Sequence, residues 1–338
     1  AIRRQRQICI RDRFGIDGLR ARADDCDLKL LIASEEKADV VNQLENTQVS
    51  IANEDFLSAL EAFPPEFAVS SRSDEYAIYQ YTSGTSRAIP TAVKHSHLSV
   101  VYLMIAALYA TGIRPGDRFF CPSSAAWGHG LWHGTLGPLT LGITTGTMSG
   151  KFDPHRFARA LSEYEITALS AAPTHFRMLR SSGAASHHQY SIEKLSYTGE
   201  PLDSTTAEFI EDVFGTIPSS MYGTTEVGTV LVNYPGADDY DVRRGTLGKP
   251  ILGTEVDVRD SHGHPCQPGE LGELVVRLSP ARERGGGQRA AEGAALPTPP
   301  RRPPPHPGGR AAARGPPGLT TTPLVSVLMP AGGVGESP

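Results

Sequence analysis

Short apolar runs and longer amphipathic segments alternate along most of this sequence. A short apolar run bounded by turn residues is typical of a buried strand, whereas apolar residues every three or four positions are typical of a helix. Strands are predicted at residues 28–33, 76–80, 118–121 and 166–170, and helices at 35–44, 55–62, 96–111, 154–164 and 204–214. Because strands alternate with helices, the pattern predicts an α/β fold whose mainly parallel sheet is covered by helices on both faces.

Capping residues define several of the predicted helix ends. Asp153 is a good N-cap because its carboxylate accepts hydrogen bonds from the first turn, and Pro154 suits the first helical position. Gly112 and Gly215 follow predicted helices and suit the left-handed conformation in which many helices end. Pro115 prevents the first of these two helices from continuing.

The last regular pattern is an antiparallel β unit. Residues 255–260 alternate as a half-buried strand, 261–265 form its turn, and 273–277 return as the partner strand. The composition then changes abruptly, because residues 279–338 hold 13 prolines, 11 glycines and no aromatic residue. Such a segment buries too little apolar surface to offset its ordering entropy, so it is predicted to be disordered. An out-of-frame or mis-spliced end is a further hypothesis, which translating the coding DNA in the other two frames would test.

These patterns divide the chain into an unstructured start at 1–12, one folded domain at 13–277 and a disordered tail at 278–338. The net charge of −5 gives no general case for a nucleic-acid partner. The four cysteines are far apart and form no CxxC pair, so neither a disulfide framework nor a thiolate zinc site is expected. The most apolar helix, at 98–110, is shorter than the ~20 residues that span a bilayer. The protein is therefore expected to be cytoplasmic, with no transmembrane segment.

A run of hydroxyl residues around one glycine follows the predicted strand at 76–80. Backbone N–H groups and side-chain hydroxyls suit a phosphate, and Gly84 lets the backbone approach it closely. The spacing is not that of a GxxxxGK[ST] phosphate loop, and taken alone the run is more often a turn. The candidate phosphate-binding residues are Thr82, Ser83, Gly84, Thr85 and Ser86.

Three later stretches add to this loop. Residues 222–226 read Tyr-Gly-Thr-Thr-Glu, in which an aromatic ring can stack on a base while hydroxyl and carboxylate groups suit phosphate and Mg²⁺. Residues 199–202 read Gly-Glu-Pro-Leu, and residues 127–130 read Trp-Gly-His-Gly. Each stretch alone is more often a turn or a strand end. His129 and His133 have the i, i+4 spacing of zinc ligands on a helix, but no third ligand accompanies them.

In this order and spacing, the stretches resemble the adenylate-forming (AMP-binding) superfamily, over roughly residues 13–277. Within it they are similar to the acyl-CoA synthetase branch of acetyl-, medium-chain acyl- and benzoate-CoA ligases. Residues 127–142 resemble the acyl-pocket helix of that branch, and residues 14–20 resemble a further family segment. The resemblance implies the large N-terminal α/β domain of an adenylate-forming enzyme.

The resemblance also implies an ATP-dependent carboxylic acid–CoA ligase, which forms an acyl-adenylate and then acyl-CoA. Its partners would be a small-molecule carboxylate, ATP with Mg²⁺, and CoA. The implied residues are Thr82, Ser83, Gly84, Thr85 and Ser86 at the phosphates; Gly199, Glu200, Pro201, Tyr222, Gly223 and Thr224 at the nucleotide; Thr225 and Glu226 in catalysis; Glu226 at the metal; and Trp127, His129 and Gly130 in the acyl pocket.

The sequence departs from the family pattern at several points. Thr91 stands where the family loop has a lysine, with Arg87 nearby as an alternative positive charge. The family's later Tyr-x-Thr-Gly-Asp motif and its small C-terminal domain, with a catalytic lysine, have no counterpart. We therefore expect an incomplete domain, truncated at both ends, that forms little or no thioester. A non-catalytic nucleotide-binding remnant, an adenylation domain that loads a carrier protein, and an unrelated turn-rich α/β protein remain alternatives.

Overall fold

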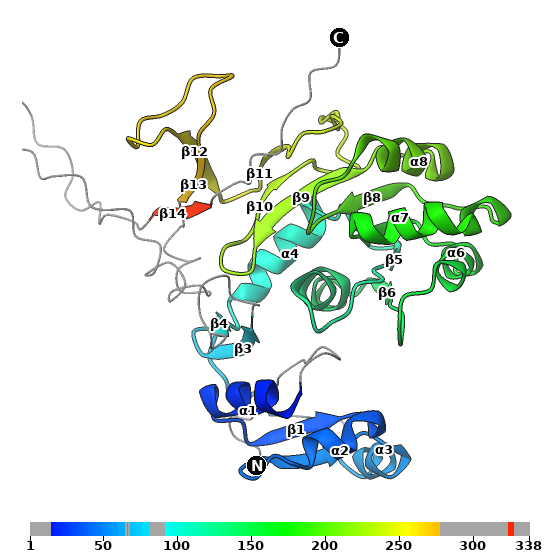
Figure 1. Ribbon diagram of the computed structural model, residues 1–338, viewed down its shortest axis with the longest axis vertical. Coiled ribbons are helices and arrows are strands. Elements are labelled where there is room, and N and C mark those ends of the chain that lie inside the picture. The colour runs from blue at the N-terminus through cyan, green and yellow to red at the C-terminus, as the bar shows by residue number, and fades with distance from the viewer. Residues whose placement is uncertain (1–14, 65, 67, 82–91, 278–323, 328–338) are drawn as a thin grey trace, which may run out of the picture.

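The computed structural model describes residues 15–64, 66, 68–81, 92–277 and 324–327. A central seven-stranded sheet has the order β11-β10-β9-β8-β7-β5-β6 (Figure 1). Its strands are β5 Arg118–Phe120, β6 Thr144–Gly146, β7 Ala168–Ala171, β8 Lys194–Tyr197, β9 Ser219–Thr224, β10 Gly228–Val232 and β11 Lys249–Pro250. Neighbours from β6 to β9 pair in parallel, and β10 and β11 add an antiparallel edge. The prediction of a mainly parallel sheet is confirmed, although the β9–β10 hairpin was not predicted.

Helices cover both faces of this sheet, as the alternation of strands and helices predicts. Successive strand residues point to opposite faces. Phe120 and Leu169 pack in the core against α6, α7 and α8, whereas their neighbours Phe119 and Ala168 pack with Ala107 of α4. The helices are α4 Ser99–Tyr109, α5 Gly137–Thr140, α6 Pro154–Glu163, α7 Pro173–Ser182 and α8 Ser204–Phe214. A π-helical segment, η2 His129–Leu136, precedes α5, and a 3₁₀ turn, η3 Ala184–His187, follows α7.

The predicted capping residues are confirmed at α6 and α8 but not at α4. The Asp153 carboxylate accepts a hydrogen bond from the Arg156 backbone N–H at 2.7 Å, and Gly215 ends α8 in the left-handed conformation. By contrast, α4 starts at Ser99 rather than at 96 and ends before its cap at Ala110. Gly112 has a positive φ of 73°, and a Cβ there would lie 2.4 Å from the carbonyl oxygen of Pro235. Its glycine therefore serves a close backbone approach.

Removal of the α6 cap tests this local assignment. We expect Asp153→Ala to lower the free energy of unfolding by about 1 kcal/mol, because the Arg156 N–H loses its acceptor. Urea unfolding measures the change. Asp153→Asn keeps a side-chain oxygen at the same position and should retain most of the stability, so equal losses in the two variants would contradict a capping role.

The N-terminal lobe lies below the central sheet in Figure 1. Its elements are α1 Ile16–Asp25, β1 Leu30–Ala33, η1 Glu35–Lys37, α2 Ala38–Val41, β2 Gln48–Ile51 and α3 Glu54–Glu61. Strands β1 and β2 pair in parallel, and their core includes Leu19 and Leu31. The predicted strand at 28–33 and helix at 55–62 are confirmed with shifted ends. The helix predicted at 35–44 is wrong in extent, because a 3₁₀ turn and a single α-helical turn take its place.

Two strands between the lobes flank the predicted phosphate loop. Strand β3 Tyr76–Tyr81 pairs antiparallel with β4 Ala92–Ser96, which was not predicted. The loop itself, residues 82–91, lies outside the described residues. The Tyr81 hydroxyl donates a 2.6 Å hydrogen bond to the Asp25 carboxylate. This bond anchors the start of the loop to α1.

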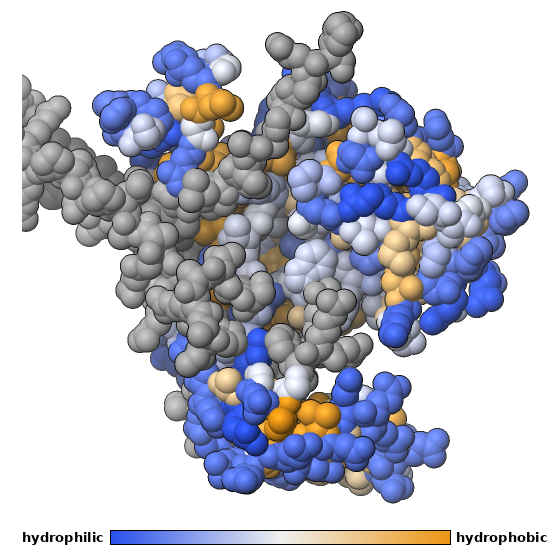
Figure 2. All heavy atoms as spheres, in the orientation of Figure 1, coloured by the Kyte–Doolittle hydropathy of each residue, from blue (hydrophilic) through white to orange (hydrophobic). Residues whose placement is uncertain are grey.

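The late β unit follows the prediction. Strands β12 Glu255–Arg259 and β13 Glu273–Arg277 pair antiparallel. The prediction of a disordered tail at 278–338 is wrong at Leu324–Val327, which forms β14 beside β13, in keeping with the strand preference of its valines. The rest of the predicted tail lies outside the described residues. In Figure 2 the N-terminal lobe and the outer sides of α6–α8 are mostly hydrophilic, with apolar residues in small separate groups. Within the described ranges no helix is long and apolar enough to cross a membrane.

Candidate active site

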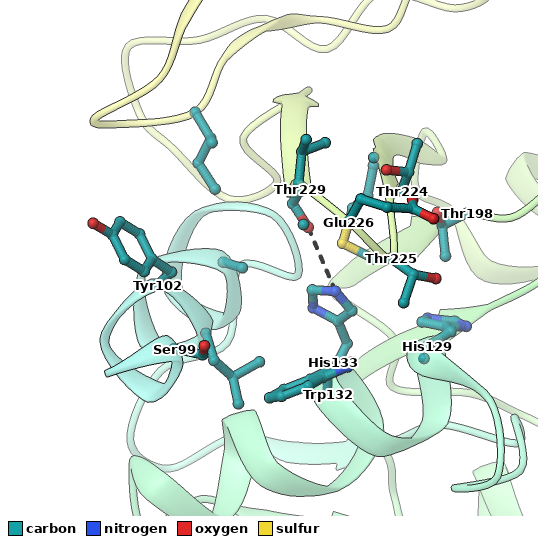
Figure 3. Close-up of a pocket in the computed structure, with 18 of the residues that line it drawn as sticks. Ser99, Tyr102, His129, Trp132, His133, Thr198, Thr224, Thr225, Glu226 and Thr229 are labelled. Carbon is teal, nitrogen blue, oxygen red and sulfur yellow. Dashed lines mark hydrogen bonds between the residues drawn. The ribbon is translucent and has the colours of Figure 1, made fainter. Parts of the chain in front are cut away.

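A cavity of about 320 Å³ lies where β3, β4, α4 and η2 meet the β9–β10 hairpin (Figure 3). It brings together residues from stretches that are far apart in the sequence. The predicted site residues that line it are Trp127, His129, Gly199, Gly223, Thr224, Thr225 and Glu226. The predicted nucleotide motif and the predicted acyl-pocket motif therefore share one cavity.

The β9–β10 hairpin positions the nucleotide motif. Gly223 faces Thr229 across the hairpin, and its missing side chain permits close approach, because a Cβ would lie 2.1 Å from the Gly228 carbonyl oxygen. Thr224, Thr225 and Glu226 follow at the end of β9, and Figure 3 shows them together on one side of the cavity. Carboxylate and hydroxyl oxygens are the donors that Mg²⁺ prefers, so this set fits a magnesium–phosphate group.

Tyr222 does not line the cavity. Its half-buried ring packs against the apolar cluster that includes Val227 and Val230, and burial raises its pKa. The predicted stacking of this ring on adenine therefore stays a prediction.

Gly199 joins the nucleotide loop to the acyl-pocket segment. Its φ is +95°, a conformation that side-chain-bearing residues rarely adopt. A Cβ at this position would also lie 2.7 Å from Cη2 of the Trp127 ring. Glycine is thus required twice, by the backbone conformation and by contact with the indole.

Glu200 and Pro201 lie outside the residues that line the cavity. The Glu200 carboxylate accepts a 2.8 Å hydrogen bond from the Thr174 backbone N–H at the start of α7 and pairs with Arg177. Burial raises the pKa of Glu200, but hydrogen bonds from Thr174 and Arg177 outweigh burial and leave the pKa below its ordinary value. These contacts brace the loop that carries Gly199, a role that the sequence did not predict.

His129 is held at both ring nitrogens. Its Nδ1 lies 3.0 Å from the Ser123 hydroxyl, and its Nε2 lies 2.8 Å from the Ser170 hydroxyl, which accepts from Ser196. Burial is the main cause that lowers its pKa, so the ring is neutral. Among the residues that the structure describes, no three or more His, Cys, Asp or Glu side chains are grouped so that they could hold a metal ion. The zinc alternative therefore gains no support.

Gly130 lies beneath the cavity wall and not on its surface. A Cβ there would lie 2.2 Å from the Ser124 carbonyl oxygen and 2.3 Å from that of Ser123. The residue thus lets η2 pack directly on the 123–124 backbone, which seats His129 against Ser123.

The lining residues that the sequence analysis did not assign to the site include Gln80, His95, Trp132 and His133. The Trp132 indole donates to the Gln80 side-chain oxygen at 2.7 Å and meets His95 edge to face, with ring centroids 4.7 Å apart. The His133 Nε2 lies 3.4 Å from the Thr229 hydroxyl. The resemblance of residues 127–142 to an acyl-pocket helix and the i, i+4 spacing of His129 and His133 pointed to part of this wall, whereas no motif marked Gln80 or His95. The predicted phosphate residues Thr82, Ser83, Gly84, Thr85 and Ser86 lie outside the described residues.

Comparison with known proteins places these features in one family. The AMP-binding enzyme family matches residues 7–281. The acetyl-coenzyme A synthetase of Bacillus subtilis (strain 168) is 26% identical over 242 residues, which cover 70% of this chain and 41% of that protein. A human mitochondrial acyl-coenzyme A synthetase is 27% identical over 219 residues, which cover 64% of this chain and 37% of that protein. The chain thus spans less than half the length of these relatives.

Solved structures show the same fold. The acyl-CoA synthetase of Brucella canis superposes with a TM-score of 0.75 at 24% identity, over 83% of this chain and 53% of that one. A benzoate CoA ligase from Burkholderia xenovorans gives a TM-score of 0.70 at 23% identity, over 82% of this chain and 56% of that one. The described α/β core therefore corresponds to the N-terminal domain of adenylate-forming enzymes.

Proposed function

Because this chain belongs to the family of AMP-binding enzymes, we propose that it is the adenylation part of an ATP-dependent carboxylic acid–CoA ligase. The observation that carries the proposal is the shared cavity, in which Trp127 and His129 face the same space as Thr224, Thr225 and Glu226. The first relatives that match are acetyl- and acyl-CoA synthetases, which supports CoA as the acceptor. Residues 13–277 form the proposed adenylation domain.

The proposed reaction has two steps. A carboxylate oxygen of the acid attacks the α-phosphorus of ATP, forming a new P–O bond while the bond to pyrophosphate breaks. The CoA thiolate then attacks the acyl carbon, a C–S bond forms, and AMP leaves with the carboxylate oxygen. Both steps need reactants held in line and charge neutralised, rather than a covalent enzyme intermediate.

The proposed site residues divide between these tasks. Thr225 is assigned to the α-phosphate and Glu226 to Mg²⁺, which, when bound, would neutralise phosphate charge. Gly199 and Tyr222 are assigned to the adenine, and residues 82–86 to the β- and γ-phosphates. Trp127 and His129 are assigned to the space for the acid.

ATP–pyrophosphate exchange tests the first half-reaction. We expect exchange with a short or aromatic carboxylic acid, and Glu226→Gln should lower kcat/KM for exchange by about tenfold or more, because the metal loses a charged ligand. Glu208→Gln, a change of the same chemistry on α8 outside the residues that line the cavity, is the control and should keep the activity.

The outcomes separate the alternatives. Exchange without thioester formation from CoA, but with transfer to a carrier protein, would favour a carrier-loading domain. ATP binding that survives both Tyr222→Ala and Glu226→Ala would remove the proposed site altogether. Binding of ATP without exchange for any acid would leave a nucleotide-binding protein without ligase activity.

A further inference from the structure

Two buried polar atoms in the wall of the cavity have no partner in the described part of the chain. They are Nε2 of His95, from β4, and Nδ1 of His133, from η2. Both residues line the cavity, and Figure 3 shows the His133 ring in its middle, between Thr229 and Trp132. A buried nitrogen that lacks a hydrogen bond is uncommon in native proteins and often marks a missing ligand or an ordered water.

Neighbouring polar groups on the same wall are satisfied. The Trp132 indole N–H is bound by Gln80, and both nitrogens of His129 are engaged by serine hydroxyls. Because these bonds fix the surrounding rings, His95 and His133 have little freedom to find partners of their own within the wall. Each of the two nitrogens has almost no accessible surface, so a bound molecule supplies the missing hydrogen bond where the ring turns that nitrogen toward the cavity.

The few charged groups in the wall limit the charge that the bound molecule can carry. Among the described residues that line the cavity, the single acidic or basic side chain other than histidine is Glu226. Burial lowers the pKa of His95 and of His133 to about 4, so both rings are neutral near pH 7. A second carboxylate buried beside them would meet no compensating cation, which is strongly unfavourable.

Much of the rest of this wall is apolar, although the hydroxyl-bearing Ser99 and Tyr102 of α4 also line the cavity. Leu103 and Ala106 of α4, with Met221 and Ile251 from the sheet side, face the cavity. The body of the acid must therefore be apolar, and only a small neutral group on it can use the two histidines.

We propose that the cavity takes a monocarboxylic acid whose apolar body bears an uncharged hydrogen-bonding group, such as a hydroxyl, which His95 and His133 bind. This rests on the ligase function proposed above and adds the substrate class. His95 and His133 are then specificity-determining residues.

The test compares acids that differ in one substituent. ATP–pyrophosphate exchange is measured with benzoate, with 3- and 4-hydroxybenzoate, and with the dicarboxylate isophthalate. We expect kcat/KM for at least one hydroxy acid to exceed that for benzoate by about tenfold, the usual worth of one buried hydrogen bond, and no exchange with isophthalate. Equal rates with benzoate and both hydroxy acids, or efficient exchange with isophthalate, would overturn the proposal.

Variants of His133 assign the preference to this side chain. His133→Phe keeps the ring shape without nitrogen and should reduce the hydroxy-acid preference to near unity. His133→Asn keeps a polar atom near the position of Nδ1 and should restore part of it, whereas His133→Gln, which places its polar atoms near Nε2, should not. A preference that persists in His133→Phe, in protein whose thermal unfolding shows that it is folded, would contradict the role of His133.

Failure of this inference is distinguishable from failure of the ligase function. Exchange with benzoate but without a preference rejects only the substrate class. No exchange with any acid rejects the ligase, and the thermal shift of the protein with each acid then decides whether the cavity still prefers the hydroxy acids. Equal shifts would reject the substrate class as well.

Discussion

Gly223→Ala should abolish exchange and lower the free energy of unfolding by about 3 kcal/mol. The new Cβ would lie 2.1 Å from the Gly228 carbonyl oxygen and 2.8 Å from Cα of Thr229. These are backbone atoms of the paired strand, so no side-chain rotation relieves the overlap. The hairpin must open, and Thr224, Thr225 and Glu226 move with it.

Urea unfolding and ATP–pyrophosphate exchange measure the two effects of this substitution. Gly15→Ala is the matched control, because a Cβ there meets nothing within 4 Å and φ is −68°. That variant should change the stability by less than about 0.5 kcal/mol. An active Gly223→Ala protein with ordinary stability would show that the hairpin is not held as closely as described.

Local chemistry made much of the fold predictable. Asp153 with Pro154, and Gly215, fixed helix ends because caps act within one turn. Where partners are distant, prediction failed. The helix expected at 35–44 had favourable composition, but α2 ends at Val41. The strand at Ala92–Ser96 was missed because its five residues gain their stability from β3, across the loop, and not from their own sequence.

The candidate site divides in the same way. Thr224–Glu226 could be found because the motif is contiguous and chemically distinctive. The two histidines at the proposed acid-binding wall could not, since only the fold brings His95 of β4 and His133 of η2 to the same cavity. Glu200 shows what a motif alone does not reveal. It was predicted at the nucleotide because of its motif, but its carboxylate binds Thr174 and Arg177 of α7.

Mild acid should destabilise this protein strongly between pH 7 and pH 5. Burial lowers the pKa of His95, His133 and His175 to about 4 in the folded chain, from the ordinary 6.5. Between these values the unfolded chain binds protons that the folded chain excludes, so stability is fullest above pH 6.5 and falls as the pH drops toward 4. At pH 5 each histidine should cost on the order of 2 kcal/mol.

Urea unfolding at pH 7.5 and pH 5.0 measures this loss of stability, and one substitution shows how much of the loss is due to His133. His133→Phe removes one proton-binding site from the unfolded chain. Between the two pH values, this variant should therefore lose roughly 2 kcal/mol less of its free energy of unfolding than the parent does. The exposed His155 supplies the control, and His155→Gln should keep the parent's pH dependence. Because lowered carboxylate pKa values act mainly below pH 4, a slope unchanged by His133→Phe would mean that this imidazole takes up a proton as readily in the folded state as in the unfolded state, and burial in the cavity wall would not hold the ring neutral in mild acid.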